Sequence, residues 1–264
     1  MRQSKLLMMQ GRLVDAPDNQ DLDWFPIKAW ADEFSLASTL GINSIELVFD
    51  KGYNKENPLR SESGREKIRE AFLLNRLTPY SGCLNFIIDN FITDIAVFDA
   101  CVSSIEALSQ LNVKFVILPL FGKSYIKLST TIQQVAKLSF IASNCGMRLL
   151  IESNENAPNI LALLKDKHLS NIAIAYDVGN ASYCGHNVEA ELLLLHEKIA
   201  HIHIKDKNIY GVNTLLGSGI VKFDSIFKSL LQSDYKGMFT LETCRGNNGL
   251  LTAKKNIQFM QKYL

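Results

Sequence analysis

Short apolar runs alternate with longer amphipathic stretches along the whole chain. Eight of these runs are continuously apolar rather than alternately apolar and polar, which is typical of strands buried on both faces of a parallel sheet. The predicted strands are KLLMM (5–9), SIELVF (44–49), TPYSGCL (78–84), KFVILPL (114–120), RLLIE (148–152), IAIAYD (172–177), IAHIHI (199–204) and MFTLE (238–242).

The stretches between these strands have the period of helices. The clearest covers residues 223–235, where the spacing i, i+3, i+4, i+7, i+8 puts five apolar side chains on one face: Phe223, Ile226, Phe227, Leu230 and Leu231. A second predicted helix covers residues 28–40, and Gly41 supplies its C-terminal stop. Strands that alternate with helices in this way indicate βα units and a parallel sheet.

Eight strands and eight helices in 264 residues match a (β/α)8 TIM barrel. A doubly wound open sheet would need a glycine-rich phosphate loop after its first strand, and the chain has QGRLVDAP there instead. Because no linker or shift in composition divides the chain, we predict a single α/β domain over residues 1–264.

Composition narrows the class of protein. The chain is 47% hydrophobic with a formal net charge of +1, and it lacks the basic footprint that nucleic-acid binding usually leaves. Neither a membrane-spanning run nor a signal peptide is evident. Five scattered cysteines without CxxC spacing indicate reduced thiols. We therefore expect a cytoplasmic protein without nucleic-acid or membrane partners.

Polar residues fall at the C-terminal ends of four consecutive predicted strands, where TIM barrels carry their active sites. They are Glu152, Asp177, His203 and Glu242. Three carboxylates in one small pocket repel each other unless a cation joins them. Taken singly, each is more often a solvated, capping or core residue, but four at equivalent positions predict a site for one divalent metal ion (Mn, Mg, Co or Zn).

At these residues the chain resembles the xylose isomerase-like TIM barrel superfamily, in particular its sugar phosphate isomerase/epimerase members. The resemblance is carried by IESN (151–154), YDVGNASYCG (176–185), HIHIKD (201–206), LGSGIVKFDSI (216–226) and LETCRG (241–246). It implies that the same four residues hold the metal and that Glu152 and Glu242 also move the proton. The implied activity is isomerisation or epimerisation of a small sugar or sugar phosphate through an enediolate.

The chain departs from the pattern of ketose 3-epimerases in this superfamily at three positions that contact substrate. Pro158 replaces a glutamate, Asn180 replaces a histidine, and Ile209 replaces an arginine, with Lys207 nearby. Two alternatives therefore stay open: a metal-dependent lyase or dehydratase of the inosose type, and a catalytically silent barrel that acts as a binding subunit. DNA endonucleases of the superfamily need further histidines, which TPYSGCL and KFVILPLFGKS do not supply.

Several residues beside the four predicted ligands are candidates for supporting roles. Asn180 and Lys205 can bind substrate, although a turn residue and an ordinary ion-pair lysine are the alternatives. Asp206 is expected to orient a loop or a ligand. Because side chains alternate along a strand, His201 should point into the barrel one layer below His203, as a packed or second-shell residue. Glu46 is expected to be a buried structural or second-shell residue.

A last group of candidates lies in the loops. Arg245 and the glycines at 217–219 follow the eighth and seventh strands, where such barrels often bind phosphate, although a plain turn is the alternative. Gln10 and Arg12 follow the first strand and are expected to line the pocket as substrate-binding residues. The sequence fixes neither the substrate nor the oligomeric state, and it is compatible with a homo-oligomer.

Overall fold

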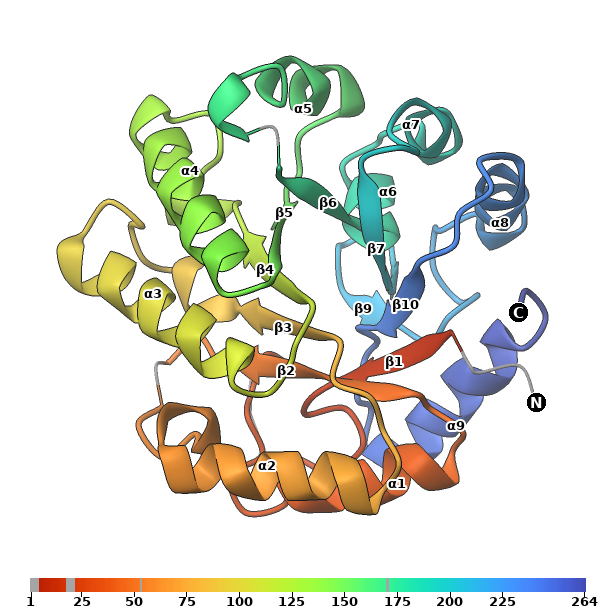
Figure 1. Ribbon diagram of the computed structural model, residues 1–264. Coiled ribbons are helices and arrows are strands. Elements are labelled where there is room, and N and C mark those ends of the chain that lie inside the picture. Colours follow the sequence, from red (N-terminus) through yellow and green to blue (C-terminus); the bar gives the residue numbers. More distant parts are fainter. Residues whose placement is uncertain (1–4, 18–21, 53, 170) are drawn as a thin grey trace.

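The computed structural model describes residues 5–17, 22–52, 54–169 and 171–264. Eight parallel strands close into a barrel in the order β1-β10-β7-β6-β5-β4-β3-β2, and the helices pack around its outside (Figure 1). The barrel strands are β1 (Leu6–Met9), β2 (Ser44–Phe49), β3 (Ser81–Leu84), β4 (Phe115–Pro119), β5 (Arg148–Glu152), β6 (Ala173–Asp177), β7 (Ile199–Ile204) and β10 (Met238–Leu241). The predicted (β/α)8 fold is confirmed.

The helices follow the strands in chain order. They are α1 (Trp30–Thr39), α2 (Glu62–Leu74), α3 (Ile95–Ser109), α4 (Ser129–Asn144), α5 (Ala157–Leu163), α6 (Val178–Tyr183), α7 (Val188–Leu194), α8 (Phe223–Gln232) and α9 (Gly249–Met260). Short 3-10 turns lie at Pro58–Arg60, Asn85–Ile87, Gly122–Ser124 and Lys167–Leu169. Among the described residues, all five cysteines are free, and no helix is long and apolar enough to cross a bilayer.

Element boundaries differ from the predicted ones where the backbone interrupts the pattern. β3 begins at Ser81 rather than residue 78, and Pro79 in between has no N–H to give to a sheet. α8 ends at Gln232 rather than residue 235, because Asp234 adopts a left-handed backbone conformation with φ of 54°. The hairpin of β8 (Asp206–Lys207) and β9 (Asn213–Thr214) was not predicted, since two residues per strand carry no period.

The barrel interior is apolar on one side and polar on the other. Inside the barrel, an apolar cluster comes from β3 to β6 and consists of Cys83, Ile117, Leu150, Ala173 and Ala175. The remaining inward positions, from β1, β2, β7 and β10, include Glu46, His201, His203 and Thr240, all with exposed fractions of 0%. Outside the strands, a much larger apolar cluster joins the sheet to the helices. Helix packing therefore stabilises the barrel, while one interior wall is left for polar groups.

A buried carboxylate shapes the loop between β1 and α1, which covers part of the barrel mouth. Glu33 on α1 is fully buried and accepts hydrogen bonds from the backbone N–H groups of Gly11 and Leu13, all at 2.9 Å. Burial raises the pKa of Glu33 to about 7, against the opposing effect of these N–H donors. Gly11 has a φ of 85°, a left-handed conformation that glycine adopts without strain.

Candidate active site

The strand register brings the four predicted ligands to one end of the barrel. Asp177 and Thr240 both pair with His203 across the sheet, and Glu242 continues two residues beyond Thr240 on the same face. Glu152 is the last residue of β5. One ligand atom from each of Glu152, Asp177, His203 and Glu242 lies within 4.8 Å of the others. Residues up to 90 positions apart in the sequence thus meet at the carboxyl ends of four adjacent strands.

These four side chains are almost completely buried, with exposed fractions of 3%, 5%, 0% and 8% in chain order. The Nδ1 atom of His203 lies 3.0 Å from Glu242 Oε2 and 3.6 Å from Glu152 Oε2. Asp177 Oδ2, His203 Nδ1 and Glu242 Oε2 make ion-pair contacts but have no hydrogen bond of good geometry within the described chain. Buried polar atoms usually have such partners, so the incomplete hydrogen bonding of these three atoms is compatible with a shared ligand.

Four buried polar residues support His203 from inside the barrel. We call them the lower layer, and they are Glu46, His201, Thr240 and Ser81. Glu46 Oε1 lies 3.0 Å from His203 Nε2, and Glu46 Oε2 lies 3.0 Å from His201 Nε2. Ser81 and Thr240 donate their hydroxyl protons to Glu46 Oε2 at 2.6 and 3.0 Å. By holding Nε2 of His203, Glu46 leaves the other ring nitrogen, Nδ1, facing the carboxylates.

His201 occupies the deeper position that its place in the strand predicts. Its Nε2 atom lies 2.7 Å from Thr240 Oγ1, and its side chain is fully buried. The His201 and His203 rings meet edge to face, with centroids 5.3 Å apart. The structure thus places one histidine among the candidate ligands and the other among the supporting groups below them.

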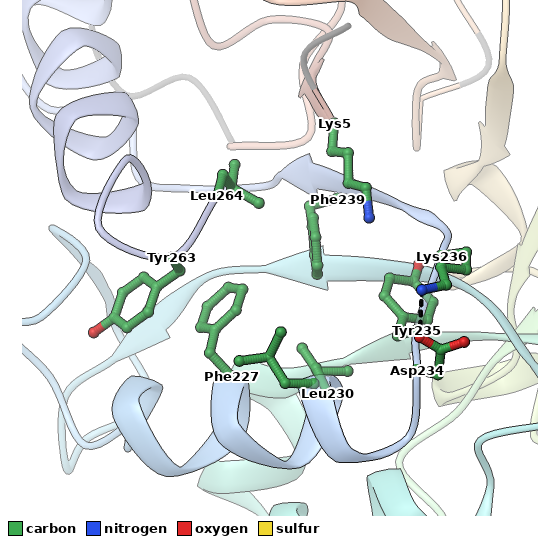
Figure 2. Close-up of a pocket in the computed structure, with 10 residues that line it drawn as sticks. Lys5, Phe227, Leu230, Asp234, Tyr235, Lys236, Phe239, Tyr263 and Leu264 are labelled. Atoms are coloured by element: carbon green, nitrogen blue, oxygen red, sulfur yellow. Dashed lines mark hydrogen bonds and ion pairs between the residues drawn. The ribbon is translucent and has the colours of Figure 1, made fainter. Parts of the chain in front are cut away.

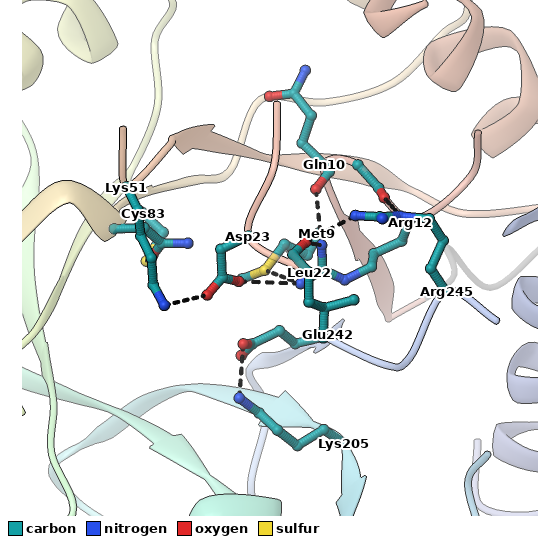
Figure 3. Close-up of polar contacts among 12 residues, drawn as sticks. Met9, Gln10, Arg12, Leu22, Asp23, Lys51, Cys83, Lys205, Glu242 and Arg245 are labelled. Carbon is teal, nitrogen blue, oxygen red and sulfur yellow. Dashed lines mark hydrogen bonds and ion pairs between the residues drawn. The ribbon is translucent and has the colours of Figure 1, made fainter. Parts of the chain in front are cut away.

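Lys205 supplies the cation of this centre. Its Nζ atom lies 2.7 Å from Asp177 Oδ2 and 2.7 Å from Glu242 Oε1. Figure 3 shows the contact with Glu242. Of the two roles predicted for Lys205, substrate binding and an ordinary ion pair, the structure shows the ion pair. Gly179, at the start of α6, permits this position, because a Cβ atom there would lie 2.3 Å from Lys205 Cγ.

The electrostatic environment separates the two glutamates. Burial raises the pKa of Glu152 to about 7, opposed by the His203 imidazole. Burial acts on Glu242 in the same direction, but Lys205 and His203 outweigh it and hold the pKa of Glu242 below its ordinary value. For Lys205 itself, burial would lower the pKa, and the carboxylates of Asp177 and Glu242 raise it instead. Two carboxyl groups in one pocket thus differ in their tendency to hold a proton.

A cavity of about 170 Å³ opens directly onto this centre. From the cluster and its neighbours it is lined by Glu152, Asn180, Lys205 and Glu242. The surrounding strand ends and loops contribute Met9, Leu22, Asp23, Lys51, Cys83, Asn85, Ile88, Pro119, Phe121, Lys207 and Asn213. Five of these lining residues were not predicted from the sequence, namely Asp23, Lys51, Cys83, Asn85 and Asn213. The signal for two of them was present, since Asn85 follows β3 directly and Lys51 follows β2 by one residue.

Arg12, Arg245 and Gln10, which were predicted to bind substrate, are not among the described residues that line the cavity. Arg12 and Arg245 are buried, and both donate to the carbonyl oxygen of Leu22. Arg12 also donates to Thr243 O at 3.1 Å, and Arg245 donates to Gly11 O at 2.7 Å. Gln10 accepts from the Val48 N–H at 3.2 Å. Arg12 also pairs with the Asp23 side chain at 3.3 Å, and the buried Gln10 Nε2 atom has no hydrogen-bond partner among the described residues. The two arginines thus fix the loops of the mouth.

Of the two alternatives given for the glycines at 217–219, a phosphate site and a plain turn, the structure favours the turn, because Asp206 accepts from these backbone N–H groups. Asp206 Oδ2 accepts from Gly217 N at 2.9 Å and from Gly219 N at 2.8 Å, while Oδ1 accepts from Val221 N at 3.1 Å. Asp206 therefore orients this loop, as expected, and its carboxylate occupies the N–H groups that would have bound an anion.

The three positions that differ from the ketose 3-epimerase pattern have different fates. Asn180 lines the cavity, and its Nδ2 atom lies 3.4 Å from Glu152 Oε1. Pro158 is exposed in the first turn of α5, and Ile209 is 71% exposed beyond β8. Of the three, only Asn180 is placed to touch a molecule bound in the cavity.

A wider cavity of about 600 Å³ lies at the opposite end of the barrel, where the strands begin. Figure 2 shows its apolar lining, with Phe227 and Leu230 from α8, Phe239 from β10, and Tyr263 after α9. The polar groups around it are the side chains of Lys5, Asp234 and Lys236 near its rim. None of the candidate metal-binding groups found among the described residues is located there, so size alone does not identify the active site.

The chain matches the model of a known protein family over most of its length. The model of the family described as xylose isomerase-like TIM barrel matches residues 34–263 of the chain. An uncharacterized protein of Methanocaldococcus jannaschii is 24% identical over 160 residues, which is 56% of this chain and 53% of that protein. A putative L-ribulose-5-phosphate 3-epimerase of Escherichia coli is 41% identical over 73 residues, 25% of this chain and 26% of that protein. The matches thus span about half, or less, of these curated relatives.

Solved structures share the architecture over nearly their whole length. A D-allulose 3-epimerase from Methylomonas sp. superimposes with a TM-score of 0.75 at 16% identity, covering 100% of this chain and 99% of the other. A probable 3-DHS dehydratase from Bacillus anthracis gives 0.70 at 15% identity, covering 88% and 93%. A xylose isomerase-like protein from Mycobacterium smegmatis, solved in complex with magnesium, gives 0.70 at 16% identity, covering 97% and 95%. At such identities the likeness establishes the fold.

Proposed function

Because the chain belongs to the xylose isomerase-like TIM barrel family, we propose that it is a divalent-metal-dependent isomerase or epimerase of a small sugar or sugar phosphate. The observation that carries the proposal is the buried cluster of Glu152, Asp177, His203 and Glu242 at the floor of the mouth cavity. The similarity of the chain to a putative L-ribulose-5-phosphate 3-epimerase and to a D-allulose 3-epimerase supports the reaction class. The free cysteines fit the reducing cytoplasm.

The donor set of the cluster fits a divalent cation. Three carboxylates and one imidazole supply the mixed oxygen and nitrogen ligands that Mn, Mg, Co and Zn ions accept. The buried Asp177 Oδ2, His203 Nδ1 and Glu242 Oε2 atoms, which lack well-formed hydrogen bonds, are the atoms that would coordinate it together with Glu152. When bound, the ion would polarise a substrate carbonyl and lower the energy of the enediolate formed next to it.

The two glutamates are the groups that would move the proton. Glu242, paired with Lys205 at 2.7 Å, is held ionised and suits a base that removes the proton from the carbon beside the carbonyl. Glu152, whose Oε1 lies 3.4 Å from the Asn180 amide, would return a proton on the other side. Return to the same carbon from the opposite face gives an epimer, and return to the neighbouring carbon gives an isomer.

Lys205, Lys207, Asn180 and Asn213 line the cavity above the cluster and can hydrogen-bond substrate oxygens. Ketose 3-epimerases of the superfamily contact substrate through a glutamate, a histidine and an arginine. The corresponding positions in this chain are Pro158, Asn180 and Ile209. The substrate is therefore held by a different set of contacts than in those enzymes.

A metal-dependent dehydratase is the second candidate function, because a dehydratase shares the fold over 88% of the chain. Both reactions begin with removal of a proton next to a carbonyl, so the cluster serves either. A silent binding subunit is less consistent with a buried, negatively charged cluster that opens onto a cavity.

The test is proton exchange in D₂O with protein loaded with Mn²⁺, Mg²⁺, Co²⁺ or Zn²⁺, against D-allulose, D-fructose, L-ribulose, L-ribulose 5-phosphate and inososes. Deuterium incorporated at the carbon beside the carbonyl without loss of water supports an isomerase or epimerase. Elimination of water supports the dehydratase. Absence of exchange with every metal and substrate, in protein that binds the metal, contradicts an enzyme of either type.

A further inference from the structure

The wall of the mouth cavity that follows β3 and β4 carries one strongly polar side chain, the amide of Asn85. Its other lining residues are Cys83, Ile88, Pro119 and Phe121. We propose that Asn85 donates a hydrogen bond from its side-chain amide to an uncharged hydroxyl group of the substrate, and that Cys83 sets the direction of this amide. Because this role concerns substrate binding, it rests on the proposed function.

The sheet register puts Asn85 level with the proposed metal centre. Cys83 is in register with Ile117, and two residues further along β4, Pro119 is in register with Glu152. Asn85 stands two residues beyond Cys83, so it belongs to the same layer as Glu152. β3 and β7 are four places apart in the ring of eight strands, so this wall faces the strand of the ligand histidine across the cavity.

The amide of Asn85 has a defined orientation. Cys83 Sγ donates to Asn85 Oδ1 at 2.9 Å, and both residues are buried, with exposed fractions of 1% and 4%. Burial raises the pKa of Cys83 well above its ordinary value, and the carboxylates of Glu46 and Glu152 act in the same direction, so the thiol keeps the proton that it donates. Since Oδ1 is the acceptor of this bond, the NH₂ group, which makes no hydrogen bond within the described chain, is the part that binds a molecule in the cavity.

The backbone around Asn85 is fixed as well. Asn85 opens the 3-10 turn that follows β3, and its carbonyl oxygen accepts from the Ile88 N–H at 3.1 Å. The carbonyl oxygen of Ile88 accepts from the Lys123 N–H at 3.0 Å, which joins the loop after β3 to the loop after β4. Gly122 permits this approach, because a Cβ atom there would lie 2.6 Å from Ile88 O. A preorganised amide binds its partner at a lower entropic cost than a mobile one.

The chemistry of this wall selects an uncharged oxygen. An amide N–H donates to the lone pairs of a hydroxyl oxygen, while the apolar side chains of Ile88, Pro119 and Phe121 cover the C–H groups beside it. A phosphate placed here would lose its water without gaining a cation from the residues of this wall, at a large free-energy cost. The group that fits is a hydroxyl on the carbon chain of a sugar whose carbonyl lies at the metal cluster.

The experiment combines one direct variant with two that act through the thiol. Asn85→Leu keeps the approximate shape of the side chain and removes its amide. Cys83→Ala removes the donor that orients the amide, and Cys83→Ser replaces this donor with a hydroxyl. Asn144→Leu is the matched control, because Asn144 is exposed at the end of α4.

Each variant is assayed with whichever of D-allulose, D-fructose, L-ribulose and L-ribulose 5-phosphate the wild-type protein exchanges fastest. Analogues of that substrate that lack one hydroxyl each, beyond the carbonyl and its neighbouring carbon, are assayed in parallel. Metal affinity and Tm are measured for every variant.

We expect Asn85→Leu to raise KM about 3-fold to 10-fold, as is usual for the loss of one hydrogen bond between uncharged groups, with little change in kcat or metal affinity. Cys83→Ala should raise KM by a smaller factor, and Cys83→Ser should restore it. One deoxy analogue should show the same rise with wild-type protein and no further rise with Asn85→Leu, because the same hydrogen bond is already missing. The control should behave as wild type.

An unchanged KM in Asn85→Leu would overturn the proposal, and so would a rise that adds to the loss for every deoxy analogue. A purely structural amide would lower Tm and leave KM unchanged. If Asn85→Leu does not fold, the two Cys83 variants decide, and equal KM values for Cys83→Ala and wild type overturn the proposal. A rise in KM for L-ribulose 5-phosphate alone would show that this wall binds phosphate instead. Absence of exchange by metal-bound wild-type protein is a separate result, which overturns the proposed function itself.

Discussion

Two polar layers lie one above the other inside the same barrel, and they differ in what completes them. In the lower layer, both Glu46 oxygens are matched by protein groups, from the two histidine rings and from the hydroxyls of Ser81 and Thr240. The upper layer consists of Glu152, Asp177, His203, Lys205 and Glu242. Its three carboxylates share one lysine and one histidine, and the group opens onto a cavity. The lower layer sets one carboxylate against two imidazole rings and does not line the cavity, whereas the upper layer holds three carboxylates and opens onto it.

The difference also appears in how the carboxyl groups titrate. Burial would raise the pKa of Glu46, but His203 and His201 outweigh it and lower that pKa well below its ordinary value. In the upper layer, burial prevails at Glu152 and raises its pKa to about 7. The two layers thus hold their carboxyl groups in opposite protonation tendencies, and a buried carboxyl with a raised pKa beside a cavity is the arrangement that functional sites favour.

The largest expected effect comes from the glutamates of the upper layer. Glu242→Gln or Glu152→Gln removes a proposed acid or base group that is also a proposed metal ligand, so we expect exchange activity to fall about 1,000-fold or more. The measurement is the rate of deuterium incorporation at saturating metal. Ser81→Ala in the lower layer is the control and should retain exchange within about tenfold. Equal losses in both layers would break the distinction between them.

A buried carboxyl outside both layers tests whether a raised pKa by itself marks a functional site. Glu33 has a pKa of about 7 against an ordinary value of 4.5, so its contribution to stability is full below pH 4.5 and is lost as the pH rises through 7. Because one pKa unit corresponds to about 1.4 kcal/mol, the loss amounts to about 3 kcal/mol.

The neutral variant Glu33→Gln should therefore gain up to about 3 kcal/mol of unfolding free energy relative to wild type between pH 4.5 and 7. Denaturant unfolding across this range measures the difference, and the exposed Asp32→Asn on the same helix is the control. Metal affinity should be unchanged, because Glu33 contacts loop N–H groups rather than the cluster. A loss of metal binding in this variant would show that the mouth loop and the centre are coupled.

The two histidines give the smallest effects and the sharpest separation. His201→Ala leaves Glu46 and Thr240 short of a buried partner, so we expect about 2 kcal/mol less unfolding free energy with metal affinity weakened only slightly. His203→Ala should weaken metal binding by about 10-fold to 100-fold or more with a modest loss of stability. Calorimetric metal titration and denaturant unfolding measure the two quantities, with the exposed His196→Ala as control. The reverse pattern would exchange the roles of the two layers.

Most of the barrel and the centre of its site follow from local pattern. Continuous apolar strands and the period of the helices suffice for the fold, and alternation along β7 suffices to separate His201 from His203. The predictions that differ from the structure concern loop residues and two arginines. Gln10, Arg12 and Arg245 follow strand ends as substrate-binding residues do, but most of their partners are backbone carbonyls and N–H groups, which no side-chain pattern reveals.

The sequence by itself determined the eight-stranded barrel, its buried faces and the four strand-end residues that meet at its mouth. These follow from periods of two and 3.6 residues, which are local properties of the chain. Only the tertiary structure decided that Asp206 fills the glycine loop, that Arg12 and Arg245 hold Leu22, and that Asp23 faces Lys51 across 3.6 Å. Such contacts join loops far apart in the sequence, and their partners depend on where the closed barrel brings those loops together.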